Sequence, residues 1–592
     1  MQAVILAAGK GSRMRPLTDT TPKALIRIGD KTIIGRILET LAAVGVHRVA
    51  VVTGYRGDEI REHLQQLHPG FDFRFIHNER FHETNNIHST ALAFQQIDLD
   101  DDVLLIESDL VAEPAVFERI VRSPHPNVAL VDHWRTGLDG TVVTVTHEGI
   151  TSVIPPHLQG ADFSFADKFK TLNVYKFDRD FCRDTFRPLL GFYASSIDHN
   201  AYYELVLGIL IYLKKVTMQA EVVHGLLWTE VDDANDLRGA EFIVGADARR
   251  RILEHDMGGY WAYDIVDFCF IRNVHFPTPA ILAELRTNLG ELLGSYGSRQ
   301  QVVDTKMANF LLCRSDRVLT LNGASQLFPF LAEYLRGRDV LLPRPTFGEY
   351  ARAFPDARFY ADTELGDTSG LESSARDVVV VVNPNNPTGT VVPTERIHAF
   401  AAAHPHLLVL VDESFVAFAG MPSMVSLLEC QPLQNVVVLA SLGKVLGVPG
   451  VRLGYLYTCD AALRTRARDW LPIWNINSVA ENLLEIVLKH RPQLEASIEA
   501  TVRDRNKMAS DLERVPGGVT VHPSGGNFLL VTLSRPAEQA AALVDALLCE
   551  HRIFVKNVSD RVGDGHTHLR LAVRGSLDNQ TLCAALTQVV ST

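Results

Sequence analysis

Short apolar runs that recur in two series constrain the fold of this chain more than any other feature. Each run is bounded by polar or turn-forming residues and is separated from the next run by a helix-like segment. The first series comprises residues 3–8, 48–54 and 102–109, and the second comprises residues 317–323, 339–343, 377–383, 407–413 and 435–441. Continuous apolar runs that alternate with helices are typical of a parallel sheet covered by helices. The sequence therefore predicts an α/β protein with two such sheets.

The chain is too long for one domain. Its 592 residues exceed what a single hydrophobic core normally serves, so two or more domains are expected. A charged and then glycine-rich segment, residues 245–264, lies between the two series of runs. We therefore predict one domain over residues 1–248 and a second over residues 249–592. The two halves carry different motifs, which indicates two different folds rather than a repeat.

Composition excludes several classes of partner. The formal net charge of −13 argues against a nucleic-acid polymer, although it leaves room for a single nucleotide in a locally basic pocket. Seven cysteines lie far apart without a CxxC pair, which is typical of reduced thiols in a cytoplasmic protein. No apolar run reaches the length of a membrane span, and the chain enters its first strand without a signal peptide. We expect a cytoplasmic protein that binds no membrane.

The first apolar run ends in a glycine-rich turn, Gly9-Lys10-Gly11-Ser12-Arg13. Glycines directly after a strand let backbone N–H groups approach an anion, and an arginine adds a fork of donors that suits phosphate. An ordinary tight turn would explain this stretch alone equally well. The turn is followed, however, by Pro16-Leu17-Thr18 and then by Pro22-Lys23-Ala24-Leu25. The whole string resembles the sugar-phosphate and choline-phosphate nucleotidyltransferases.

This resemblance implies a Rossmann-like fold with a mixed sheet and a site for a nucleoside triphosphate. It implies that Lys23 neutralises charge where the attacking oxygen meets the α-phosphorus, in a reaction that needs alignment more than covalent help. The residues implied to bind the nucleotide are Leu6, Ala8, Gly9, Gly11, Arg13 and Asn85.

Three carboxylates are candidates for a magnesium site. Asp109 ends the third apolar run, and Glu230 and Asp232 lie far downstream in LLWTEVDDANDL. Alternation along an extended segment puts Glu230 and Asp232 on one face. Nucleotidyl transfer needs a divalent metal held by oxygen ligands, so we predict that the three acids bind Mg²⁺. The alternative is that the downstream acids are exposed in a loop.

Residues 78–93, which read NERFHETNNIHSTALA, resemble the choline-phosphate cytidylyltransferases. That branch uses CTP and includes enzymes that activate phosphonates. Residues 167–177 are similar to the acceptor-side strand of the same branch, with Lys170 and Asn173 as implied contacts to the acceptor. The alternative for the first stretch is that Asn85 and Asn86 are turn residues.

The second half carries three motifs in order, namely VVVVNPNNPTG at 379–389, LVLVDESF at 408–415 and ASLGKVLGVPGVRLGY at 440–455. They resemble the fold-type I pyridoxal phosphate enzymes of the histidinol-phosphate aminotransferase and threonine-phosphate decarboxylase branch. The resemblance extends over residues 265–590. It implies that Lys444 bonds covalently to the aldehyde cofactor and that Asp412 keeps the ring nitrogen protonated.

The same resemblance implies further contacts in a homodimer. Arg570 is implied to bind the substrate carboxylate, and Tyr296 to reach the cofactor phosphate of the neighbouring subunit. The other implied cofactor contacts are Ala324, Ser325, Ser441 and Arg452 to the phosphate, Asn386 to the ring oxygen and Phe347 to the ring face.

Two departures from the family pattern indicate an unusual substrate. Many relatives have a tyrosine three residues after the ring-nitrogen acid, where this chain has Phe415, and threonine-phosphate decarboxylases also tend to have phenylalanine there. Relatives also carry an Asn-x-Asn-Pro-aromatic-Gly string near the start of the domain, whereas residues 270–279 read FIRNVHFPTP.

The combination of both halves resembles the bifunctional CMP-phosphonate synthases of phosphonate-antibiotic pathways. This implies that the first half joins CMP to an amino phosphonate such as 2-amino-4-phosphonobutyrate, and that the second half removes the α-carboxylate as CO₂. One alternative is that the second half transaminates a phosphonoaldehyde or amino phosphonate. Another is that one half is a non-catalytic binding or regulatory module, against which Lys23, Asp109, Asp412 and Lys444 argue.

Overall fold

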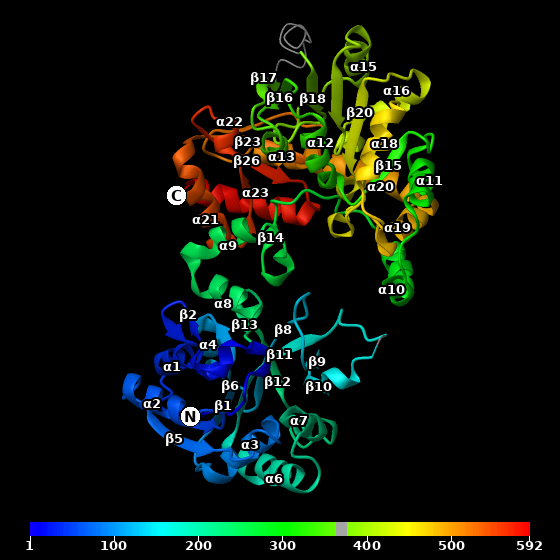
Figure 1. Ribbon diagram of the computed structural model, residues 1–592. Helices are drawn as coiled ribbons and strands as arrows, with labels where there is room; N and C mark the ends of the chain where they lie inside the picture. Colours follow the sequence, from blue (N-terminus) through cyan, green and yellow to red (C-terminus); the bar gives the residue numbers. More distant parts are fainter. Residues whose placement is uncertain (161, 363–375, 592) are drawn as a thin grey trace. The chain divides into compact units, whose positions relative to one another are not determined.

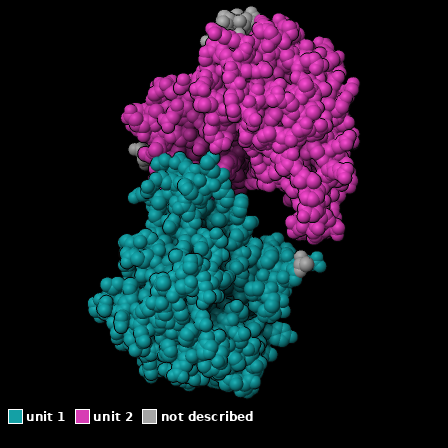
Figure 2. Space-filling model, viewed as in Figure 1, with its two compact units in different colours: residues 1–264 teal, residues 265–592 magenta. Residues whose placement is uncertain are grey.

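The computed structural model describes residues 1–160, 162–362 and 376–591. The chain forms two compact units, Met1–Asp264 and Ile265–Thr592 (Figures 1 and 2). Helix α9 (Arg249–Asp256), which begins at the domain boundary expected from the sequence, lies within the first unit. Each unit is described by itself below.

The first unit contains a nine-stranded mixed sheet in which the three expected apolar runs form central parallel strands. The strand order is β10-β9-β11-β6-β1-β4-β5, with β8 pairing β11 and β12. Strands β6, β1, β4 and β5 are parallel, and β11 runs antiparallel to β6. The strands are β1 Gln2–Ala7, β4 Arg48–Thr53, β5 Asp72–His77, β6 Val103–Glu107, β8 Val128–His133, β9 Val142–Thr146, β10 Gly149–Ile154, β11 Phe169–Phe177 and β12 Gln219–Val222.

Helices cover both faces of this sheet because its central strands are apolar on both sides. In β1, Ile5 packs into one hydrophobic cluster, while Val4 and Leu6 pack into the other. The helices of the first cluster are α1 (Ile33–Ala43), α2 (Gly57–Leu67) and α4 (Pro114–Arg122), and those of the second are α3 (Asn86–Gln96), α6 (Arg187–Ser196) and α7 (Tyr203–Tyr212). Parallel strands end at a common edge of the sheet, so the loops after β1 and β6 meet there.

The second unit is built on a seven-stranded sheet of order β15-β21-β20-β19-β18-β16-β17. Six of these strands run in the same direction, and β21 runs antiparallel to both of its neighbours. The strands are β15 Val318–Leu321, β16 Val340–Arg344, β17 Arg358–Ala361, β18 Val378–Val382, β19 Leu408–Asp412, β20 Val436–Ser441 and β21 Gly454–Thr458. A smaller antiparallel sheet contains β22 (Val519–Val521), β23 (Phe528–Pro536), β26 (His566–Ala572) and β25 (Lys556–Asn557).

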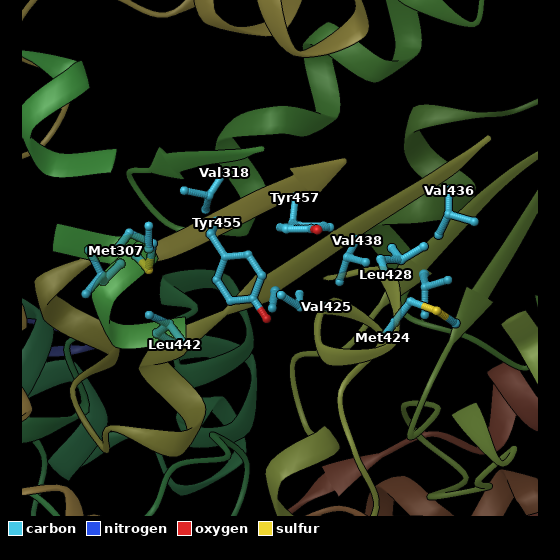
Figure 3. Close-up of a cluster of buried hydrophobic side chains, with 14 of the residues drawn as sticks. Met307, Val318, Met424, Val425, Leu428, Val436, Val438, Leu442, Tyr455 and Tyr457 are labelled. Atoms are coloured by element: carbon cyan, nitrogen blue, oxygen red, sulfur yellow. The ribbon is translucent and has the colours of Figure 1, made fainter. Parts of the chain in front are cut away.

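The core of the second unit lies on both faces of its large sheet. Figure 3 shows Met307 of α11 (Gln300–Leu311) beside Tyr455, and side chains of α16 (Met424–Cys430) near Val436 and Val438 of β20. The alternate residues of β20, Val437 and Leu439, belong to a second cluster on the other face. Each fully buried side chain of this size contributes about 1.5–3 kcal/mol to folding.

The fold prediction is confirmed, since the chain has two different α/β folds. None of the seven cysteines, all of which lie among the described residues, forms a disulfide bond. Among the described residues, none of the helices combines the length and the apolar character that crossing a membrane requires.

Candidate active sites in the two units

A cavity of about 300 Å³ opens at the edge of the first sheet where β1 and β6 end. The structure brings most of the residues expected for nucleotide and metal binding to its wall. The expected residues that line it are Leu6, Ala8, Gly9, Gly11, Arg13, Lys23, Asn85, Asp109 and Asp232. Glu230, Lys170 and Asn173 are not among the lining residues.

The glycine-rich turn needs glycine for two different reasons. Gly11 has φ +59°, and a Cβ there would lie 3.1 Å from Cβ of Lys23 and 3.1 Å from Cγ2 of Thr18. The Thr18 hydroxyl donates to the Gly11 carbonyl at 2.8 Å, which fixes this close approach. A Cβ at Gly9 would meet nothing within 4 Å, so the backbone at Gly9 faces open space where an anion can approach its N–H group.

Lys23 and Arg13 lie against the carboxylates that are expected to hold the metal. Nζ of Lys23 donates to Asp109 Oδ2 and Asp232 Oδ1, each at 2.8 Å, and Arg13 Nη2 lies 3.0 Å from Asp232 Oδ1. Burial acts to lower the pKa of Lys23, but the two carboxylates outweigh burial and hold the pKa above its ordinary value. Asp109 Oδ1 is buried without a hydrogen-bond partner among the described residues. The oxygen donors and this orphaned oxygen fit a hard divalent cation such as Mg²⁺.

Glu230 joins the expected metal and acceptor residues in one network. It ends β13 (Trp228–Glu230), and its Oε1 accepts hydrogen bonds from Lys170 Nζ and Asn173 Nδ2, each at 2.9 Å. Burial raises the pKa of Glu230 to about 7, although Lys170 opposes the rise. One carboxylate oxygen from each of Glu230, Asp232 and Asp139 lies within 4.8 Å of the others. Sequence reasoning missed Asp139, because a single acid in a loop carries no pattern.

The expected cofactor site of the second unit is centred on Lys444. This lysine lies in α17 (Leu442–Val445), directly after β20, and is partly buried. Burial, together with the positive charges of Arg570 and Arg452, lowers the pKa of Lys444 to about 8, while Asp412 opposes this. A lysine with a lowered pKa is more often the neutral amine that attacks an aldehyde.

Asp412 ends β19 and is held by three hydrogen bonds. Its Oδ1 accepts from the backbone N–H and the hydroxyl of Ser414, and its Oδ2 accepts from the Tyr350 hydroxyl at 2.9 Å. Burial raises the pKa of Asp412, and these hydrogen bonds act against the rise. Sequence reasoning missed Tyr350, which lies in the PTFGEY segment and is fully buried in α13 (Gly348–Ala353).

Arg570 and Asn386 form a buried pair. Arg570 Nη1 donates to Asn386 Oδ1 at 2.8 Å, and Nη2 donates to the Cys269 carbonyl. Nε of Arg570 is buried and has no hydrogen-bond partner among the described residues. Burial lowers the pKa of Arg570, so a ligand carboxylate would both pair its charge and satisfy the remaining N–H.

Only some of the residues expected at the cofactor phosphate contact one another among the described residues. Arg452 Nη2 donates to Ser325 Oγ at 2.7 Å, in the turn that begins at Ala324. The Ser441 backbone N–H donates to the Ser414 hydroxyl, which also donates to Asp412. Phe347 directly precedes α13. Tyr296 is 78% exposed and stacks on Trp474, and none of the described contacts joins it to this group.

The two departures from the family pattern meet in one small hydrophobic cluster, which contains Phe415 and Ile271. Phe415 is buried and packs edge-on against Phe528, with ring centroids 5.0 Å apart. The backbone of Asn273, in the segment that lacks the family string, donates to the Lys444 carbonyl at 2.8 Å. A Cβ at Gly447 would lie 2.3 Å from the Asn273 carbonyl oxygen, so this segment packs tightly against the lysine loop.

Comparison with known proteins matches each unit to a family. Residues 3–160 match the MobA-like NTP transferase domain, and residues 272–589 match aminotransferase class I and II. The chain is 32% identical to CMP-5'-(3-aminopropyl)phosphonate synthase of Streptomyces rubellomurinus, over 100% of this chain and 95% of that protein.

Further matches concern the second unit. The chain is 29% identical to L-serine phosphate decarboxylase of Sulfurospirillum multivorans, over 55% of this chain and 88% of that protein. The structure of L-threonine-O-3-phosphate decarboxylase from Porphyromonas gingivalis superposes with a TM-score of 0.50 and 24% identity, over 55% of this chain and 100% of that one. At this identity the likeness shows the fold alone.

Proposed function

This chain belongs to the family of CMP-5'-(3-aminopropyl)phosphonate synthase and, in its second half, to the class I and II aminotransferases, and we propose that it activates an amino phosphonate with CTP and then decarboxylates it. It is an enzyme with a nucleotidyltransferase domain and a pyridoxal phosphate-dependent, aminotransferase-like domain. The proposed acceptor is 2-amino-4-phosphonobutyrate, and the proposed product is CMP-5'-3-aminopropylphosphonate. The observation that carries the proposal is the similarity to one synthase over the whole chain.

In the first step, the phosphonate oxygen of the acceptor attacks the α-phosphorus of CTP and pyrophosphate leaves. The turn from Gly9 to Arg13 holds the triphosphate, and Lys23 neutralises charge at the reacting phosphorus. Asp109, Asp232 and Glu230 would hold Mg²⁺, which neutralises charge on the phosphates when it is bound.

The acceptor end of the first site is proposed at Lys170 and Asn173. Both side chains donate to Glu230, so they lie beside the proposed metal ligands. Lys170 is 1% exposed, so the surrounding residues hold its side chain in place. A phosphonate that contacts Lys170 would therefore be held near the charge of the metal site, which favours alignment with CTP.

In the second step, the CMP-linked amino acid loses its α-carboxylate as CO₂, and a proton takes its place on Cα. Pyridoxal phosphate, when it is bound, withdraws electrons from the bonds at Cα. Asp412 holds the proton on the ring nitrogen, Arg570 binds the carboxylate, and Nζ of Lys444 can return a proton to Cα. The buried Phe415, at a position where threonine-phosphate decarboxylases also tend to have phenylalanine, supports decarboxylation rather than transamination.

The proposal includes a homodimer formed through the second unit, with Tyr296 of one subunit near the cofactor phosphate of the other. The exposure of Tyr296 and its stacking on Trp474 support this role, since both aromatic rings are available to a partner. Sedimentation velocity of the full chain measures the oligomeric state, and a monomer at micromolar concentration would contradict this part.

Two assays test the two steps. Pyrophosphate release with CTP, Mg²⁺ and 2-amino-4-phosphonobutyrate tests the first step. For the second, the purified CMP ester of that amino acid, labelled with ¹⁴C in the carboxyl group, is supplied without any keto acid. We expect labelled CO₂ and a primary amine. Turnover that requires a keto acid and retains the label would make the second unit an aminotransferase.

A further inference from the structure

Two carboxyl groups beside the first cavity, one partly buried and one buried, form no ion pair among the described residues. Glu107 ends β6 and lines the cavity, and Glu204, in the first turn of α7, is 4% exposed. In the part of the chain that the structure describes, neither of them forms an ion pair with a lysine, an arginine or a histidine. The other acids of the site differ, since Asp109, Asp232 and Glu230 each contact a lysine.

Neutral groups satisfy only part of the hydrogen-bonding capacity of these carboxyl groups. Asn86 Nδ2 donates to Glu107 Oε1 at 3.1 Å, and Asn86 Oδ1 accepts from the Tyr203 backbone N–H at 3.1 Å. Glu204 Oε2 and the hydroxyl of Tyr203 are buried without a hydrogen-bond partner among the described residues. Asn86 is thus fixed at both ends and orients Glu107, while the polar groups behind Glu107 keep unused hydrogen-bonding capacity.

Such an arrangement is costly for folding alone. A buried carboxyl group without a cation destabilises a protein, and an apolar side chain at the end of β6 would avoid this cost. Val103 and Leu105 of the same strand face the same hydrophobic cluster, which shows what the fold uses on this face where no ligand is near. A ligand that brings a positive charge into the cavity would compensate Glu107.

We propose that Glu107, positioned by Asn86, binds the ammonium group of the acceptor, so that the first unit selects phosphonates that carry an amine. This inference rests on the proposed function, because that function supplies an amino phosphonate to this cavity. Glu107 is the residue that contacts the substrate, and Asn86 is a positioning residue. Lys170, proposed above as the contact of the phosphonate, is positively charged, so the first unit offers opposite charges to the two ends of a zwitterionic acceptor.

The exocyclic amine of cytosine is a second source of N–H donors in this cavity. It is neutral, so it could donate a hydrogen bond to Glu107 but could not form an ion pair with it. The observations therefore favour the ammonium group. The experiment below separates the two sources, because one concerns the acceptor and the other concerns the base.

The test uses the full chain with the variant Glu107→Gln, which keeps the shape and removes the charge. Pyrophosphate release is measured with CTP and Mg²⁺ for 2-amino-4-phosphonobutyrate and for 4-phosphonobutyrate, which lacks the amine. We expect Glu107→Gln to raise KM for the amino acid about tenfold more than for the amine-free analogue, as for one lost charge-assisted hydrogen bond. The matched control is Glu221→Gln, since Glu221 of β12 contacts Ser123 away from the cavity. This control should leave the KM ratio of the two acceptors unchanged.

Each other outcome overturns the inference in a recognisable way. Equal effects of Glu107→Gln on both acceptors, or a wild type that uses both acceptors equally well, would leave cytidylylation standing and remove the role of Glu107. A selective rise in KM for CTP, with UTP accepted as well as CTP, would assign Glu107 to the base. No pyrophosphate release with any phosphonate would overturn the proposed function itself. If Glu107→Gln does not fold by circular dichroism, Asn86→Ala replaces it, and KM should again rise more for the amino acid than for the amine-free analogue because Glu107 loses its orientation.

Discussion

The hydroxyl of Tyr350 offers a sharp test of the second site, because one oxygen atom can be removed without changing the packing. It donates to Asp412 Oδ2 at 2.9 Å in a fully buried setting, and the ring packs edge-on against Phe328 with centroids 4.9 Å apart. The hydroxyl acts to lower the pKa of Asp412, so Tyr350→Phe should raise that pKa further above its ordinary value. A carboxyl group that protonates more easily is a weaker partner for a protonated ring nitrogen.

The expected loss of cofactor affinity depends on whether Asp412, which accepts the hydrogen bond from Tyr350, is charged. A hydrogen bond to a charged group contributes about 1.5–3 kcal/mol, whereas one to a neutral group contributes about 0.5–1.5 kcal/mol. Asp412 must be ionised when it pairs with the ring nitrogen, and burial favours its neutral form otherwise. The difference of about 1–1.5 kcal/mol corresponds to cofactor binding that is weaker by about five- to tenfold.

The assay is a titration of cofactor-free protein with pyridoxal phosphate, followed by the visible absorbance of the lysine-bound cofactor. The matched control is Tyr360→Phe, because the Tyr360 hydroxyl donates to the neutral Val380 carbonyl at 2.9 Å in the same sheet. This control should lose about 1 kcal/mol of stability and keep the wild-type Kd for the cofactor. An unchanged Kd in Tyr350→Phe, or an equal weakening in Tyr360→Phe, would refute the reasoning.

Three further predictions concern single side chains. Asp109→Asn should lower the rate of pyrophosphate release by about a hundredfold or more through lost metal binding, while cofactor absorbance persists; a wild-type rate at saturating CTP and Mg²⁺ would contradict this. Because burial lowers the pKa of Lys444 to about 8, the cofactor-free protein should gain stability as pH rises from about 8 to about 10.5, and Lys444→Met should lack this gain in urea unfolding. Gly11→Ala should raise KM for CTP because of its φ of +59° and the Lys23 contact, whereas Gly45→Ala, with φ +79° and open space around it, should leave that KM unchanged.

Sequence reasoning predicted the site residues that lie at or just after the ends of strands. Asp109 follows the end of β6, Asp412 ends β19 and Lys444 follows β20, and apolar runs predict such strand ends well. Parallel strands place their carboxyl ends at one edge, so the grouping of Asp109 with the glycine-rich turn could also be expected. The mixed character of the first sheet follows from the family resemblance rather than from periodicity.

The remaining site residues could not be predicted because they arrive from distant parts of the chain. Asp139 lies in an irregular loop, and only the fold brings it near Glu230 and Asp232. The bond between Arg570 and Asn386 joins residues that are 184 positions apart, and that between Tyr350 and Asp412 joins residues 62 apart. Such contacts depend on side-chain direction and burial, which periodicity does not encode.

Glu107 is a candidate binding residue that its surroundings in the structure indicate and that no sequence motif predicts. In the sequence Glu107 belongs to the string Glu-Ser-Asp at residues 107–109. Asp109, as a predicted metal ligand at a strand end, already explains the acidic character of that string, so Glu107 receives no role of its own. In the structure the two acids differ in their partners, since Asp109 forms an ion pair with Lys23 whereas Glu107 accepts a hydrogen bond from the neutral Asn86. Asp109 keeps an unpartnered Oδ1 that suits a metal ion, whereas Glu107, which has no ion pair in the described part of the chain, suits a cationic group of the substrate. The same reasoning applies to the buried Nε of Arg570, a positive group with an unused N–H. An α-amino acid with a phosphonate tail carries both complementary charges, an ammonium group for Glu107 in the first unit and a carboxylate for Arg570 in the second.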